Sequence, residues 1–134
     1  MNAETDLDTL IRNLEPRTLA DTYVFCSVRD ANYGALAHTS PLASFAEPEG
    51  LTLVLTREAA GEEDLSYEGT FRCISLQVHS SLAAVGLTAA VTGELAAHDI
   101  SANVIAAYHH DHIFVPSHQV ESALRLLENM SSRR

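Results

Sequence analysis

The sequence predicts an α+β protein, because short strand patterns and short helix patterns succeed one another along its 134 residues. Two observations favour this class. Residues 71–130 are expected to form a strand, a helix, two strands and a second helix. Residues 7–58 are expected to contain one helix and at least two strands, so strands and helices are mixed in both halves of the chain.

The first half begins with an amphipathic helix, followed by strands. Its apolar residues recur at the spacing of one helical face, at Leu7, Leu10, Ile11 and Leu14. "DTYVFCSV" (21–28) is rich in β-branched and aromatic residues, and "EPEGLTLVLTRE" (47–58) places three leucines on one face of a second strand. The stretch 58–69 holds five acids and two glycines and is expected to be a solvated connection between the halves.

The second half has the clearer pattern. "FRCISLQV" (71–78) alternates strictly and places Arg72 on the same face as Ile74 and Leu76. A helix should follow and end near residues 98–99, then two short strands at 100–108 and 112–116, then a helix from Val120 with Ser117 as its N-cap. One more edge strand would complete a ferredoxin-like βαββαβ plait, and the first half could supply that strand.

Composition excludes several kinds of partner. Eight lysines and arginines against eighteen acids give a net charge of −10, which repels nucleic-acid phosphates and anionic membranes. No apolar run approaches the roughly 20 residues of a membrane span, and the acidic N-terminus does not resemble a signal peptide. We therefore expect a cytoplasmic protein, in which Cys26 and Cys73 are buried free thiols.

The chain resembles a known family. "LAAVGLTAAVTGELAAHDISANVIAAYHHDHIFVP" (82–116) is similar to the ACT domain, a small regulatory module of amino-acid metabolism. "TLIRNLEPRTLADTYVFCSV" (9–28) and "FAEPEGLTLVLTRE" (45–58) extend the resemblance to free-standing bacterial ACT proteins related to the regulatory region of aspartate kinase. The resemblance implies tandem, possibly interleaved ACT units, an N-terminal half 1–64 and a C-terminal domain 65–134. It also implies an amino-acid ligand and a homodimer or higher oligomer.

The same resemblance implies a ligand site where the loop after the strand 71–78 faces the next strand. The residues at these positions are Ser80, Ser81, Leu82, Ala83, Ala84, Val85 and Gly86, with Asn103, Val104 and Ile105 opposite. A loop that enters a helix presents unpaired N–H groups to a carboxylate, and Asn103 offers an amide to a polar ligand. Alternatively, the serines close a turn, Gly86 serves packing, and Asn103 is a polar residue on an outer strand face.

The histidine cluster of residues 109–112 is the other candidate site. In a strand, His110 and His112 would share a face and could hold a metal ion if a third ligand converged. No further ligand stands at a characteristic spacing, and we expect a structural hairpin or a subunit contact, with no metal and no cofactor. Nucleophile and phosphate-loop motifs are absent, which predicts a non-catalytic protein. An oligomerisation module without ligand and a metal-dependent protein are the alternatives.

Overall fold

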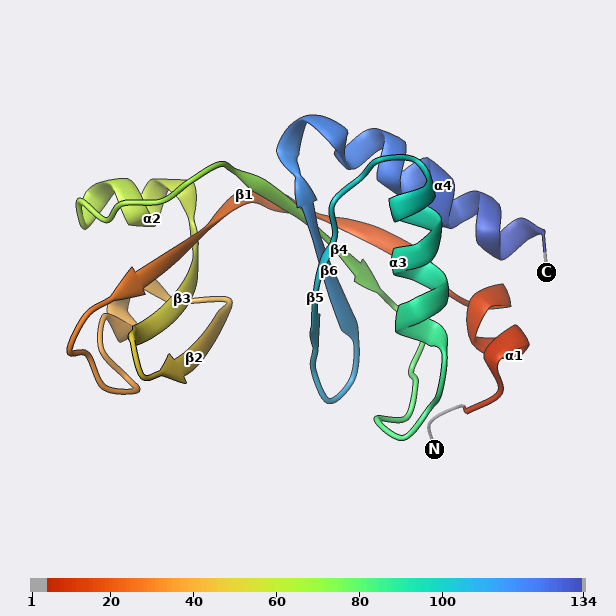
Figure 1. The fold of residues 1–134 in the computed structure, drawn as a ribbon, viewed down its shortest axis with the longest axis horizontal. Helices are drawn as coiled ribbons and strands as arrows, with labels where there is room; N and C mark the ends of the chain where they lie inside the picture. Colours follow the sequence, from red (N-terminus) through yellow and green to blue (C-terminus); the bar gives the residue numbers. More distant parts are fainter. Residues whose placement is uncertain (1–4, 134) are drawn as a thin grey trace. The chain divides into compact units, whose positions relative to one another are not determined.

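The computed structural model describes residues 5–133, and these residues form two compact units. Unit 1 is the described part of residues 1–20 together with the chain from Arg72 onward, and unit 2 is Asp21–Phe71. Strand β1 (Pro16–Val28) belongs to both units, because the chain passes from one to the other at its middle (Figure 1). The two ACT-like units are therefore interleaved in sequence. The expected division after residue 64 stays a prediction.

Unit 1 is a plait whose edge strand comes from the first half of the chain. Its strand order is β1-β4-β6-β5, formed by the start of β1, β4 (Phe71–Leu76), β6 (Asp111–Pro116) and β5 (Asn103–Ala106). Its helices are α1 (Leu7–Arg12), α3 (Leu87–Ala97) and α4 (Val120–Ser132). The predicted order of strands and helices after residue 71 is confirmed, and β1 is the edge strand that this half lacks.

The N-terminal extension of β1 is a difference from the sequence prediction. The predicted strand began at Asp21, whereas β1 begins at Pro16. Residues 16–20 carry a proline, an arginine and an alanine and have little intrinsic strand preference. Pairing beside β4 compensates for that weak preference, and Pro16 is tolerated because it stands at the first position of the strand.

The core of unit 1 lies between its strands and three helices that cover one face (Figure 1). Leu95 of α3, Ile74 of β4 and Leu127 of α4 are fully buried there, in one cluster with Leu10 and Ile11 of α1. The alternation in β4 explains this arrangement, because Ile74 and Leu76 project to the helix side while Cys73 and Ser75 project to the other.

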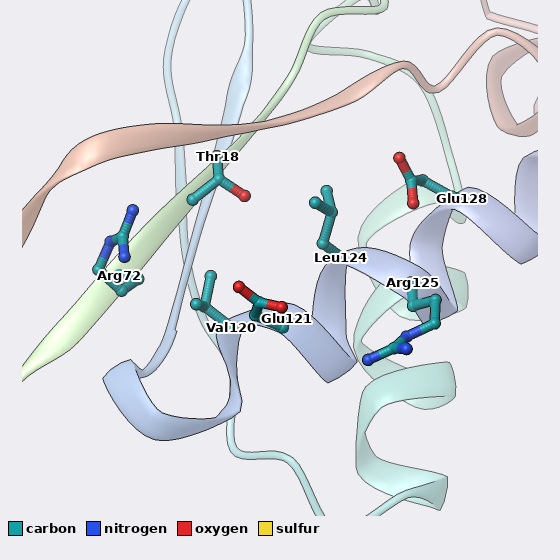
Figure 2. A pocket seen from close by; sticks show the side chains of 7 residues that line it. All are labelled: Thr18, Arg72, Val120, Glu121, Leu124, Arg125 and Glu128. Atoms are coloured by element: carbon teal, nitrogen blue, oxygen red, sulfur yellow. The ribbon is translucent and has the colours of Figure 1, made fainter.

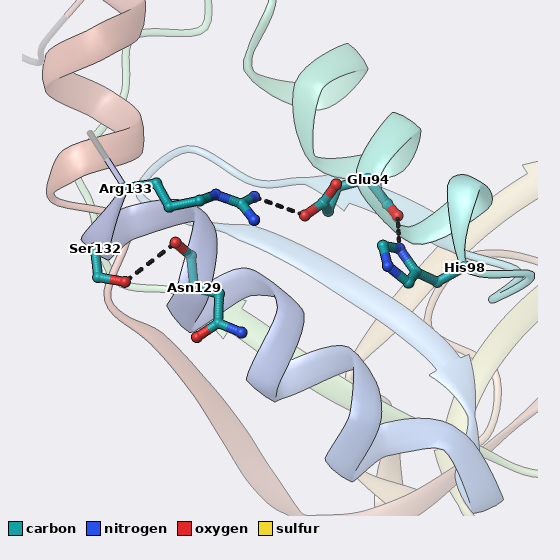
Figure 3. A network of polar contacts seen from close by, with 5 residues as sticks. All are labelled: Glu94, His98, Asn129, Ser132 and Arg133. Carbon is teal, nitrogen blue, oxygen red and sulfur yellow. Dashed lines mark hydrogen bonds and ion pairs between the residues drawn. The ribbon is translucent and has the colours of Figure 1, made fainter.

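Polar contacts tie the helix ends of unit 1 together at the surface. Arg133 contacts Glu94 of α3, with Nη2 and Oε2 2.8 Å apart, and the His98 ring lies 3.0 Å from the Glu94 carbonyl oxygen (Figure 3). At the same end of α4, the Ser131 hydroxyl donates to the carbonyl oxygen of Arg12 at 2.7 Å. Exposed ion pairs contribute little, at most about 1 kcal/mol, so buried apolar area rather than this network holds the helices.

Unit 2 is a three-stranded antiparallel arrangement in the order β2-β3-β1. β3 (Gly50–Thr56) follows β2 (Ala43–Glu47) through a tight hairpin, and the predicted leucine face of β3 is buried. β2 itself was not predicted, because its pattern of alanine, serine and a single phenylalanine carries little strand signal.

Two expectations about helices are wrong. The stretch 58–69 was expected to be a solvated connection, but its first residues belong to α2 (Arg57–Glu62). The Thr56 hydroxyl accepts a hydrogen bond from the Ala59 N–H at 3.1 Å, and Ala60 is fully buried, so a cap and one anchoring residue are sufficient. Ser117 is not the N-cap of α4, because a 3₁₀ turn (Ser117–Gln119) precedes the helix and Gln119 takes that position.

Within residues 5–133, no helix combines the length and the apolar character that a bilayer span requires.

Candidate functional site

Gly86 begins α3 in a backbone conformation that favours glycine. Its φ is +99° and no side chain caps the helix, while its carbonyl oxygen accepts the first helical bond from the Ala90 N–H at 2.9 Å. A Cβ at this position would lie 3.3 Å from Leu7 Cδ2 of α1. Gly86 therefore serves both the turn and the packing of α1, and the first N–H groups of α3 are left without a side-chain acceptor at the cap.

The loop ahead of Gly86 is closed by Ser81. The Ser81 hydroxyl accepts from the Ala83 N–H at 3.1 Å, and its carbonyl oxygen accepts from the Ala84 N–H at 3.0 Å. This is the turn-closing role that the sequence left open as an alternative. Leu82 and Val85 are 69% and 84% exposed, so the loop presents apolar side chains to solvent. Ser80 and Ala83 lie in the same loop.

The other predicted segment lies in β5, the edge strand of unit 1. Asn103 is exposed, and its neighbour Val104 packs against the helix-side core, so Asn103 and Ile105 project to the opposite face. β5 begins at Asn103 at the end of the sheet where α3 ends, whereas residues 80–86 lie where α3 begins (Figure 1). Within one chain the two halves of the predicted site therefore lie apart, and the site stays a prediction.

The histidine hairpin, not Asn103, is the neighbour of this loop. The rings of His79, just after β4, and His109 have centroids 5.4 Å apart, and Tyr108 stacks edge-on against His109 at 5.0 Å. The turn is closed by the Ala107 N–H, which donates to the His110 carbonyl oxygen at 3.1 Å. His110 lies in the turn and His112 in β6, so the two do not form an HxH pair within one strand.

The electrostatics of the hairpin centre on Asp111. Burial raises the pKa of its carboxyl group, and the positive charges of His112 and His110, when protonated, partly oppose this rise. His110 Nδ1 is buried and has no hydrogen-bond partner. Among the described residues, no three histidine, cysteine or acidic side chains lie close enough to hold a metal ion together. The turn brings the rings of His109 and His110 near each other, with centroids 6.3 Å apart, and its expected structural role stays a prediction.

The two cysteines are buried and free. Burial raises the pKa of both thiols, that of Cys73 to about 12. A thiol with such a pKa is protonated near neutral pH and is a poor nucleophile. The cysteines therefore fit the expected structural role.

The proximity of residues 79–86 to the turn at residues 107–110 was not predicted from the sequence. A signal for this proximity existed in the predicted strand order. β4 and β5 both lie next to β6. In an antiparallel sheet, two strands that flank the same strand run in the same direction, so both finish at the same end of the sheet. The loop after β4 and the turn after β5 must therefore lie at the same end of the sheet.

These features define a class of protein with tandem ferredoxin-like plaits. In unit 1, the loop of residues 79–86 leads into α3, whose N-terminus has no side-chain cap. Two ACT-domain family models match the chain, one over residues 2–72 and the other over residues 68–129. The chain belongs to the ACT-domain family. No curated protein is significantly similar to it in sequence.

Several solved structures are similar to this chain. A protein of unknown function from Vibrio cholerae, described as a possible transport protein, is 46% identical, with 93% of this chain and 95% of that chain covered and a TM-score of 0.85. A protein from Agrobacterium tumefaciens is 19% identical over 87% and 88% of the two chains, with a TM-score of 0.73. The regulatory subunit of aspartate kinase from Thermus flavus shares the fold at 12% identity, with 87% and 96% covered and a TM-score of 0.62.

Proposed function

We propose that the chain is a non-catalytic regulatory protein that binds a small molecule, and that the ligand is an amino acid. The observation that carries the proposal is the start of α3 in an ACT unit, where Gly86 leaves the first turn without a side-chain cap. Unpaired N–H groups and the positive end of the helix dipole suit a carboxylate. An amino acid supplies that carboxylate together with an ammonium group.

The structural neighbours support this ligand class. Regulatory subunits of aspartate kinase have the same fold, and the E. coli aspartokinase III structure was solved in complex with aspartate and ADP. That enzyme is 16% identical, and the match covers 86% of this chain and 32% of that chain with a TM-score of 0.61. In this proposal residues 80–86 bind the ligand, because they lead into the uncapped start of α3.

The remaining features of the proposal concern assembly and location. Residues 103–105 would complete the site from a second copy, since within one chain they lie at the other end of the strands (Figure 1). β5 is an edge strand whose outer backbone groups are free to pair with another chain. We propose that the protein forms a homodimer in the cytoplasm. Each chain would consist of an N-terminal half, residues 1–64, and a C-terminal domain, residues 65–134. Light scattering that gives a monomer mass with and without ligand would contradict this assembly.

A charge placed at the start of α3 tests the ligand site. Ala89 is exposed in the first helical turn, and a glutamate there should be tolerated by the helix dipole while repelling a ligand carboxylate. We expect the melting temperature of the unmodified protein to rise with one or more common amino acids at millimolar concentration. The rise should disappear in Ala89→Glu and persist in Ala89→Gln, which has the same size without the charge.

A rise that is equal in both variants would place the ligand elsewhere, and no rise with any amino acid would exclude this ligand class. An interaction module without ligand is the second candidate, because Leu82, Val85 and Tyr108 are exposed on the loop and the turn that meet at one edge of unit 1. Such a patch favours a protein contact. The module predicts an oligomer that Val85→Ser dissociates, with no response to amino acids.

A further inference from the structure

Arg72 is a charged residue on the core-facing side of a strand. In β4 it shares a face with Ile74 and Leu76, which are fully buried under the helices. Its Nη2 donates to the carbonyl oxygen of Leu19 at 2.9 Å, which anchors the guanidinium to β1. Its Nε is buried and has no partner. A buried N–H group without an acceptor is costly and rare.

Arg72 lines a pocket of about 290 Å³ that lies entirely within unit 1. Thr18 of β1 also lines it, and α4 contributes a row of side chains at helical spacing, namely Val120, Glu121, Leu124, Arg125 and Glu128. Figure 2 shows Arg72 and Thr18 on the strand side and the Glu121 carboxylate on the helix side of the same space. The Arg125 guanidinium points away from that space. Val120 and Leu124 supply apolar surface between the charges.

The charges around this pocket do not neutralise one another. The ion pairs found among residues 5–133 join His38 to Glu63 and Arg133 to Glu94, and neither includes Arg72, Glu121 or Glu128. A guanidinium therefore faces a carboxylate across the pocket with no ion pair between them. The space matches a molecule that carries both charges, with an anionic group for Arg72 and a cationic group for Glu121.

We propose that this pocket is a second small-molecule site of unit 1, and that its ligand is a dipolar molecule with a carboxylate and an ammonium group, such as a free amino acid with a medium-sized apolar side chain. The carboxylate accepts hydrogen bonds from the Arg72 guanidinium and from the Thr18 hydroxyl. The ammonium group pairs with Glu121, and the apolar side chain contacts Val120 and Leu124. The lining of this pocket includes no residue of the loop at residues 80–86.

The charged side chains of the pocket favour a dipolar ligand over a purely anionic or purely cationic one. A simple anion such as phosphate would leave Glu121 and Glu128 facing another negative charge, which disfavours binding. A purely cationic ligand would be repelled by the guanidinium. An arginine fork matches a planar carboxylate with paired hydrogen bonds, which gives the site orientation as well as attraction.

Calorimetry and NMR with matched probes test the proposal. L-Leucine is titrated beside leucinamide, which lacks the carboxylate, and N-acetyl-leucine, which lacks the ammonium group. We expect saturable binding of leucine, with shifts of the amide signals of Thr18, Arg72 and residues 120–128. Both analogues should bind at least tenfold more weakly. Glu121→Gln and Arg72→Gln should each weaken leucine binding at least tenfold.

Three variants make the outcome decisive. Arg17→Gln removes an equal charge from the neighbouring, exposed position of β1, whose side chain projects to the other face, and should leave binding unchanged. Glu121 is exposed, so Glu121→Gln tests the site even if Arg72→Gln fails to fold. Ala89→Glu, which blocks the proposed loop site, should not affect this one. Shifts confined to residues 80–90, binding undiminished in Glu121→Gln, or no binding of leucine would overturn the proposal.

Discussion

Unit 1 and unit 2 belong to a chain that two models of the same family match, but the units differ in how many residues they bury. Among the described residues, the main core of unit 1 contains fifteen buried residues and that of unit 2 contains six. Three helices cover the strands of unit 1, whereas unit 2 has α2 and a single 3₁₀ turn. Since buried apolar area is the main source of stability, we expect unit 2 to be the less stable of the two.

The difference is greatest where the plait of unit 2 would have its first helix. Residues 29–42 hold the 3₁₀ turn (Ala37–Thr39) but no α-helix, and Asp30, Leu36 and Ser40 all have positive φ. Such a backbone is unfavourable for residues other than glycine, above all for a large one such as leucine. The segment borders a pocket of about 440 Å³, and the nearby Ser44 hydroxyl is buried without a partner. A shared fold pattern therefore does not imply equal packing.

The largest expected effect comes from matched deletions in the two cores. Leu127 in unit 1 and Leu53 in unit 2 are both almost fully buried, and each leucine-to-alanine change should cost about 2–5 kcal/mol. We expect Leu127→Ala to lower the melting temperature of the whole chain. Leu53→Ala should instead speed hydrogen exchange mainly in β2 and β3. Equal acceleration throughout the chain in both variants would show that the units unfold together.

The cysteines provide a smaller but direct measure of the same difference. Cys26 lies in the core of unit 2 and Cys73 is buried in unit 1, and burial raises the pKa of both thiols. Each must therefore be exposed by opening before a maleimide can react. We expect Cys26 to be labelled at least about tenfold faster, which corresponds to about 1.4 kcal/mol in opening free energy. Peptide mapping by mass spectrometry identifies the site, and faster labelling of Cys73 would reverse the ranking.

The smallest effect concerns the hairpin of unit 1. Burial raises the pKa of Asp111 above its ordinary value of 3.8, so the folded protein holds this proton more tightly than the unfolded chain. Its contribution to stability is complete below that value and is lost as the pH rises through the folded pKa. Asp111→Asn should therefore raise the melting temperature slightly at pH 7 and leave it unchanged near pH 3. A decrease at pH 7 would mean that the charged carboxylate stabilises the hairpin.

Much of unit 1 could be predicted because its patterns are strong. Alternation identified β4, and helical spacing identified α3, whose C-cap at His98 lies where the sequence placed the end of the helix. Unit 2 was predicted less well, since β2 lacks strand formers and α2 depends on a threonine cap and one buried alanine. The candidate site could likewise be predicted only in part. Gly86 was identified as a special position, but its contact with Leu7 arises from helix packing.

The surroundings of Arg72 could not be predicted from the sequence. Its place on the face of Ile74 and Leu76 was visible in the alternation, yet the partners that give it meaning come from β1 and α4. Those residues are distant in sequence, and periodicity carries no information on which helix face covers which strand.

By itself, the sequence determined the α+β class, the order of elements after residue 71 and the family, because these follow from local periodicity and from residues that resemble the ACT pattern. Only the tertiary structure decided that residues 16–20 complete the plait of unit 1, that the loop at residues 79–86 meets the histidine turn, and that Arg72 faces Glu121 across a pocket. Each of these depends on contacts between distant segments, whose free energy comes from burial and pairing rather than from local preference.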